Sequence, residues 1–222
     1  MVPDVSVAML HSQWSAAQGK VINGMAAAWP AVAAHYGLAT KLRAAHFWGQ
    51  ISWECGGGTE LRESGHYTAA GIMRVFGVGS GASAKVSPEE AVRLAEQAKS
   101  DNGRALFNRV YGLGNPKKAA ELGNSGPDDG WLYRGAGALN STGRAAFLRI
   151  GKAIGRDLVG DPGLADDPEI ALWMGAEDYV ELGCLAHADA DDTRAETLRI
   201  NGGVDGLAGR IRLIGAWKRL LA

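Results

Sequence analysis

The chain has 222 residues, of which 46% are hydrophobic and 21% charged, and 23 Lys and Arg against 24 Asp and Glu give a formal net charge of −1. Such a length can bury a sizeable core in one domain, and the composition excludes disordered and collagen-like chains. Because the charge is balanced, the chain as a whole has no electrostatic attraction for nucleic acid or anionic lipid. We therefore expect no nucleic-acid partner.

The N-terminal part of the chain predicts neither a signal peptide nor a membrane anchor. Asp4 lies where a signal peptide would be basic, so we expect synthesis in the cytoplasm without a signal peptide. The apolar stretch from Met25 to Ala34 is interrupted by Pro30 and is far shorter than the roughly 20 residues that span a bilayer. We therefore expect no stable membrane insertion.

Helices are the first regular elements that the sequence predicts. Residues 22–37 form one, and a second begins after Thr40, where apolar residues recur at helical spacing until the glycines at 56–58. Glu54 is therefore expected at a helix C-terminus, beside a glycine-rich loop.

Later helices are marked by their first residues. Ser87, Pro88 and Glu90 provide an N-cap, a first-turn proline and a capping-box glutamate. Asp167 begins another helix in a similar way, and Asp205 is expected to cap the last one, whose apolar residues should pack in the core.

Between these helices the sequence is rich in glycine and turns. We allow at most a small β-hairpin at residues 133–139, followed by a helix over 143–154. The predicted fold class is mainly α with long Gly-rich loops, and residues 1–222 show no internal domain boundary. Cys55 and Cys184 match no metal-ligand spacing, so we expect free thiols.

Carboxylates surround a glycine bend in the segment Glu54-Cys-Gly-Gly-Gly-Thr-Glu60-Leu-Arg-Glu63. Glycoside hydrolysis commonly uses one carboxylic acid to protonate the leaving oxygen and one carboxylate as base or nucleophile, about 6.5–9.5 Å apart in inverting enzymes. Two glutamates on either side of such a loop could span that distance. Solvated charges beside a turn would give the same spacing, so both interpretations stay open here.

A second cluster combines small residues with hydrogen-bonding side chains. It includes Arg134, Asn140 and Thr142, and its composition suits sugar hydroxyls and amides. A plain hairpin followed by a helix that Thr142 caps would explain it equally well. Trp131, beside a glycine-rich turn, is expected near a cleft.

The remaining tryptophans divide by their surroundings. Trp48, Trp173 and Trp217 stand at helical spacing and are expected in the core. Trp53, like Trp131, adjoins a glycine-rich segment, so it could either pack in the core or stack against a sugar.

Four segments resemble glycoside hydrolase family 19 endolysins and chitinases, in the family's order and over about residues 20–220. They are LRAAHFWGQISWECGGGTELRESGHYTAAGIMRVFG at 42–77, NRVYGLGN at 108–115, DGWLYRGAG at 129–137, and INGG at 200–203 with Arg210 following. The resemblance implies an α-rich, two-lobed lysozyme-like fold whose cleft binds β-1,4-linked N-acetylhexosamine polymers, which are cleaved with inversion.

The resemblance also implies catalytic roles. Glu54 matches the general acid, and Glu63 matches the second glutamate of the bacteriophage-type members, the base that activates water. Thr142 stands where a Ser or Thr of the family helps to hold that water. The implied substrate-binding or supporting residues are Trp131, Tyr133, Arg134, Asn140, Asn201 and Arg210, with Asn201 also helping to orient the base.

Several polar residues of the family pattern are replaced in this chain. The departures are Trp53 for His, Cys55 for Ser, Ala136 for the second Arg of R-G-R-G, Asn140 for Gln, and Ala146-Phe147 for Asn-Tyr. Because both glutamates persist, the sequence predicts a divergent but active enzyme.

The two glutamates need different protonation states. We expect neighbours such as Trp53 to desolvate Glu54 and raise its pKa, and Glu63 to stay ionised in a wetter site. This chemistry requires no metal and no other cofactor, and the five His are too scattered for a metal site.

The sequence thus predicts a monomeric endolysin- or lysozyme-like hydrolase that lyses bacterial cell walls by cleaving peptidoglycan, acting on the wall or periplasm after release from the cytoplasm. The alternatives are a chitinase acting on chitin oligomers, a catalytically impaired glycan-binding homologue, and a lytic transglycosylase that needs a single glutamate.

Overall fold

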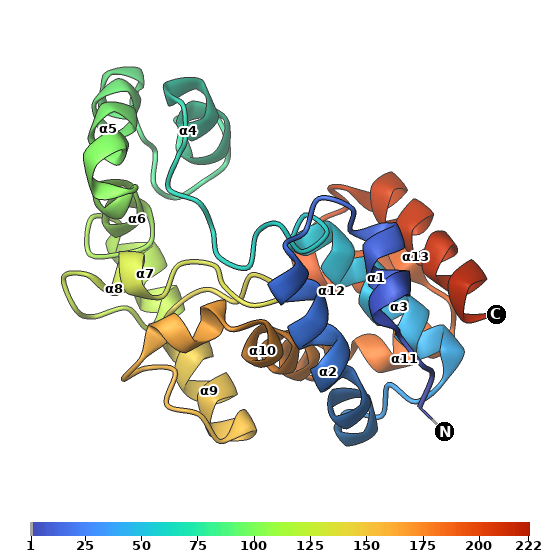
Figure 1. The fold of residues 1–222 in the computed structure, drawn as a ribbon. Coiled ribbons are helices and arrows are strands. Elements are labelled where there is room, and N and C mark those ends of the chain that lie inside the picture. The colour runs from blue at the N-terminus through green and yellow to red at the C-terminus, as the bar shows by residue number, and fades with distance from the viewer. Residues whose placement is uncertain (1) are drawn as a thin grey trace.

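The computed structural model describes residues 2–222, which are almost entirely helices and their connections (Figure 1). In chain order the elements are α1 (Val7–Gln13), α2 (Gly19–His35), α3 (Lys41–Glu54), α4 (Ala69–Phe76), α5 (Pro88–Asp101), α6 (Arg104–Val110), α7 (Pro116–Leu122), α8 (Asp129–Leu132), α9 (Arg144–Ile154), the 3₁₀ helix η1 (Pro162–Asp166), α10 (Pro168–Glu181), α11 (Cys184–Asp189), α12 (Thr193–Asn201) and α13 (Leu207–Leu221). The mainly α prediction is confirmed.

The small hairpin allowed at 133–139 is reduced to isolated bridges. Ala136 pairs with Arg62 on one side and with Ser141 on the other, and residues 2–222 contain no β-strand. Gly137 and Asn140 both have positive φ, at 76° and 54°, so the backbone bends away after a single pair.

The predicted helix starts at Thr40, Ser87 and Asp167 are confirmed, because each side chain accepts a hydrogen bond from an amide of the first turn. The capping box at Ser87 is only half formed. Glu90 donates its amide to the Ser87 hydroxyl at 3.2 Å, but its carboxylate pairs with Arg109 instead of reaching back.

The predicted cap at Asp205 is wrong. Gly206, with φ 75°, is the N-cap of α13, and Asp205 is exposed in the turn before it. Glycine is favoured there because this backbone conformation is left-handed.

Two groups of helices give the molecule its two lobes. In Figure 1, α4, α5 and α6 stand apart from α1, α2, α3 and α13, and the chain between α3 and α4 crosses from one group to the other. The larger group packs around Trp48, which contacts the rings of Trp14, Trp29 and Trp217. The smaller group has its own core, which includes Phe107. A third cluster around Phe147 joins α9 to the start of α10.

Helices α3 and α13 approach closely along the larger lobe. A Cβ on Gly49 would lie 2.3 Å from Cγ1 of Ile214, so only glycine permits this packing. Trp217 is fully buried, which confirms that the last helix packs in the core. Within residues 2–222 no helix combines the length and the apolar composition that a membrane-spanning segment requires.

Candidate active site

Glu54 is the last residue of α3, at the edge of the larger lobe. Its side chain is 17% exposed, and its Oε1 accepts a hydrogen bond from Nη2 of Arg210, which lies in the first turn of α13. Asn140 donates from Nδ2 to the Glu54 carbonyl at 2.6 Å. Three of the residues that the sequence assigned to the site, from three distant segments, therefore meet here.

Arg210 is buried, with 1% of its surface exposed. Its Nη1 donates to Oε1 of Gln50 at 2.7 Å, whereas its buried Nε has no hydrogen-bond partner in the part of the chain that the structure describes. The guanidinium is thus fixed between Glu54 and Gln50.

Trp53 precedes Glu54 and packs its ring against the start of α13. It is 40% exposed, and its ring lies against the backbone of Gly206 and Gly209. A Cβ on Gly209 would lie 2.0 Å from Cζ3 of Trp53. The indole therefore fixes the start of α13, the helix that carries Arg210.

Glu63 lies in the chain between α3 and α4. Its amide donates to the Gly135 carbonyl at 2.8 Å, and its Oε1 accepts from the hydroxyls of Tyr67 at 3.1 Å and Tyr111 at 3.2 Å. Burial raises the pKa of Glu63, while the two phenol hydrogen bonds and Arg134 act in the opposite direction. The expectation of a wetter site for Glu63 is therefore wrong.

The side chains of Glu63 and Thr142 both lie close to Gly135. A Cβ on this glycine would lie 3.3 Å from Oε2 of Glu63 and 3.4 Å from Oγ1 of Thr142. Thr142 donates its hydroxyl to the Asn140 carbonyl at 3.0 Å and does not cap α9, whose N-cap is Gly143. Thr142 Oγ1 and the free oxygen of Glu63 are thus both close to Gly135.

Arg134 supports Glu63 from the other side. It donates from Nε to the Glu63 carbonyl at 3.1 Å and from Nη1 to the Trp131 carbonyl at 2.8 Å. Its guanidinium carbon lies 3.5 Å from the centroid of the half-buried Trp131 ring. Burial, and then Arg62, lowers the pKa of Arg134 to about 10, so the side chain is cationic at neutral pH.

Two of the expected substrate-binding residues are placed differently. Tyr133 is 5% exposed, packs against Phe147 and donates its hydroxyl to the Val159 carbonyl at 3.1 Å, so it serves the core. Asn201 is exposed at the end of α12, and the structure gives it no hydrogen bond to Glu63.

Four polar residues around the two glutamates were not predicted from the sequence. They are Tyr67 and Tyr111 on Glu63, and Gln50 and Glu196, which continue the contacts of Arg210 into the larger lobe. A signal was available for Gln50, because it stands four residues before Glu54 on the same helix and so shares its face.

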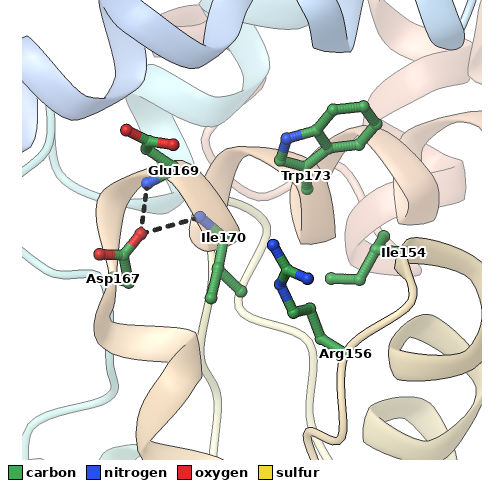
Figure 2. Close-up of a pocket in the computed structure, with 6 residues that line it drawn as sticks. All are labelled: Ile154, Arg156, Asp167, Glu169, Ile170 and Trp173. Carbon is green, nitrogen blue, oxygen red and sulfur yellow. Dashed lines mark hydrogen bonds between the residues drawn. The ribbon is translucent and has the colours of Figure 1, made fainter.

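A separate cavity of about 480 Å³ lies between the end of α9 and the start of α10. Figure 2 shows Trp173 above it and the Arg156 guanidinium between Ile154 and Ile170. Trp173 is half-buried and contacts the ring of His35, so it packs against the edge of the larger lobe's core. None of the residues that line this cavity is a predicted site residue.

Cys55 and Cys184 are both buried and free, as expected. Within the described residues 2–222, no three His, Cys, Asp or Glu side chains group as ligands of a metal ion.

Comparisons with known proteins identify relatives by sequence and by fold. No protein-family model matches the chain. A glycosyl hydrolase family 19 domain-containing protein of Haemophilus influenzae is 27% identical over 187 residues, which are 81% of this chain and 80% of that protein.

Two solved structures share the fold. Chitinase C from Streptomyces griseus has a TM-score of 0.59 at 17% identity, covering 99% of this chain and 93% of its own. A bacterial family 19 chitinase has a TM-score of 0.56 at 19% identity, covering 98% and 95%. Over four fifths of its length the chain is thus similar in sequence to a glycosyl hydrolase family 19 domain-containing protein, and over nearly all of its length it shares the fold of these chitinases.

Proposed function

We propose that this protein cleaves the β-1,4 glycosidic bonds of bacterial peptidoglycan with inversion, using Glu54 as general acid and Glu63 as general base. One observation carries the proposal. Each glutamate has one oxygen fixed by protein donors, and among the described residues nothing donates to its other oxygen. A carboxyl group held in this way keeps one oxygen free for proton transfer.

The acid step uses the free oxygen of Glu54. Arg210 occupies Oε1, so the proton is carried on Oε2 and passes to the glycosidic oxygen as the bond from that oxygen to C1 breaks. The Asn140 contact with the Glu54 carbonyl holds the end of α3 in place during this step.

The base step uses Oε2 of Glu63. A water between this oxygen and the opposite face of the sugar loses a proton to Glu63 as its oxygen bonds to C1, and the anomeric configuration inverts. Thr142 Oγ1 and this oxygen both lie close to Gly135, and the role proposed for Thr142 is to hydrogen-bond to that water. The proton on Glu63 then returns to solvent, and Glu54 regains one.

Two observations bear on the substrate. The segment with Glu54 and Glu63 resembles the bacteriophage-type members of the family, which favours peptidoglycan. Chitin is the second candidate, because the solved structures of similar fold are described as chitinases.

The test is reducing-end release from purified peptidoglycan and from chitin oligomers by the wild type, Glu54→Gln and Glu63→Gln. Glu60→Gln is the matched control, because Glu60 is an exposed glutamate of the same loop. We expect each active-site variant to lose roughly 10²- to 10⁴-fold in rate on peptidoglycan and the control to keep its rate.

Other outcomes would redirect the assignment. Release from chitin alone would make the protein a chitinase. Anhydro-sugar ends together with an active Glu63→Gln would indicate a transglycosylase. Binding without release by the wild type would indicate a glycan-binding homologue.

A further inference from the structure

A continuous series of polar contacts leads from Glu54 through the larger lobe to its surface. Arg210 joins Glu54 to Gln50, and Gln50 donates from Nε2 to Oε2 of Glu196 at 3.1 Å. The same Glu196 oxygen lies 2.7 Å from Nδ1 of His46, whose Nε2 lies 2.8 Å from Asp191.

Lys218 of α13 completes the series by donating to Asp191. The interior of this series is dry, since His46, Gln50 and Glu196 are fully buried. His46, Glu196 and Gln50 therefore lie in the apolar core of the larger lobe, outside the active site. Polar groups buried there are destabilising unless each is hydrogen-bonded or paired with an opposite charge.

Glu196 is built as a carboxylate. Its Oε2 accepts a hydrogen bond from Gln50 and lies 2.7 Å from Nδ1 of His46, and its Oε1 accepts one from the hydroxyl of Tyr179 on α10. Gln50 and Tyr179 both donate to this group, which suits an ionised carboxyl group. Asp191 adopts φ 55° to reach His46, a left-handed conformation that few side chains adopt.

The orientation of Gln50 links this charge to the catalytic acid. Its carbonyl oxygen accepts from Arg210 and its amide nitrogen donates to Glu196, so one amide group lies between the guanidinium and the buried carboxylate. Arg210 thus contacts Glu54 directly and is linked to Glu196 through the Gln50 amide.

We propose that Glu196 is a positioning residue that acts through Gln50 and Arg210 to set the upper pH limit at which Glu54 still carries its proton. The proposal deepens the proposed function and rests on it. Without the charge of Glu196, Arg210 would act on Glu54 alone and favour its ionised form, and the repulsion between the two carboxylates would also vanish. Both effects would favour the ionised form of Glu54.

Other ionisable groups also face Glu196. On the elements packed against it these are His46 on α3, Tyr179 on α10 and Cys184 on α11. Burial raises the pKa of the Cys184 thiol to about 12, so it stays neutral. Arg43 and Arg199 lie beyond Tyr179 and Cys184, and Lys218 and Asp191 lie beyond His46.

The test compares the pH profile of kcat/KM for the wild type and Glu196→Gln. We expect the alkaline limb of the variant to move to lower pH by about 0.5–1 unit, with KM and the acid limb unchanged. Glu196→Asp keeps the charge and should keep most of the wild-type profile. Glu90→Gln, which removes the partner of Arg109 in the smaller lobe, is the matched control and should shift nothing.

A second measurement does not depend on turnover. The ¹³C resonance of the Glu54 carboxyl group, assigned by its absence in Glu54→Gln, should titrate at lower pH in Glu196→Gln than in the wild type. If Glu196→Gln does not fold, Gln50→Met interrupts the same path and should shift both readouts in the same direction.

The outcomes separate the two proposals. A wild type that releases no reducing ends overturns the proposed function, while the carboxyl titration still decides the role of Glu196. An active wild type whose alkaline limb and Glu54 titration are unaffected by Glu196→Gln or Gln50→Met overturns this inference alone.

Discussion

The hydroxyl of Tyr111 lies 3.2 Å from Oε1 of Glu63, although 48 positions separate the two residues. Tyr111 ends α6 in the smaller lobe, and Glu63 lies in the chain that crosses between the lobes. A phenol donor stabilises the ionised carboxylate, so this contact ties the protonation state of the proposed base to the packing of the smaller lobe.

Tyr111→Phe should raise the pKa of Glu63 further, because the variant removes one of the hydrogen bonds that oppose the effect of burial. A base must be ionised, so the acid limb of the kcat/KM profile should move to higher pH. The matched control is Tyr133→Phe, which removes a hydroxyl that donates to the Val159 carbonyl. An acid limb that moves equally in both variants, or in neither, would contradict the role given to Tyr111.

Glu63→Gln should stabilise the folded protein at neutral pH while abolishing activity. Burial raises the pKa of Glu63 in the folded state above its unfolded value, so this group favours folding below the unfolded pKa and loses that contribution as pH rises through the folded pKa. Glutamine resembles the protonated acid and avoids the cost of ionisation.

Thermal unfolding at several pH values measures this effect. We expect a Tm for Glu63→Gln a few degrees above the wild type at pH 7, and a difference that disappears below about pH 4, where the wild-type carboxyl group is protonated in both states. A variant that is less stable than the wild type at pH 7 would show that the ionised carboxylate is favourable in this site.

Gly206→Ala should destabilise the protein more than Gly202→Ala. Both glycines have positive φ, 75° and 70°, so an alanine costs about 1 kcal/mol of backbone strain in each. Only at Gly206 would the new Cβ also meet an atom, since Cε2 of Trp53 lies 2.3 Å away. We expect a further 1–3 kcal/mol or so from this overlap, measured by urea unfolding.

A double-mutant cycle isolates the contribution of the indole. In the background of Trp53→Ala, the extra cost of Gly206→Ala over Gly202→Ala should largely vanish. If the difference between the two glycines persists without the ring, its source is the backbone and the assigned clash with Trp53 is wrong.

The two cysteines should resist thiol reagents in the native protein. Burial raises the pKa of Cys55 and of Cys184 to about 12, so neither forms appreciable thiolate at pH 8. We expect no rapid labelling by a disulfide reagent in buffer and two labelled thiols per chain in denaturant. Rapid labelling of either thiol in buffer would reveal local opening of α3 or α11.

Local sequence signals determined the helices and part of the site. Thr40, Ser87 and Asp167 marked true helix starts because a cap depends only on neighbouring residues. The motif around Glu54 and Glu63 carried the resemblance to family 19, and a family 19 domain-containing protein is 27% identical over 187 residues. The motif is local in the chain, and the chemistry of glycoside hydrolysis needs two carboxyl groups whatever surrounds them.

Tertiary structure alone decided the electrostatics of these groups. The sequence favoured a desolvated Glu54 and a wet Glu63, yet Glu54 pairs with Arg210 from α13, and burial raises the pKa of Glu63. Burial and ion pairing depend on residues far apart in the chain, such as Tyr111 and Glu196, which no local pattern connects. Which protons the site holds is therefore decided by how the helices pack, because packing fixes the distances and the access of water that govern charge.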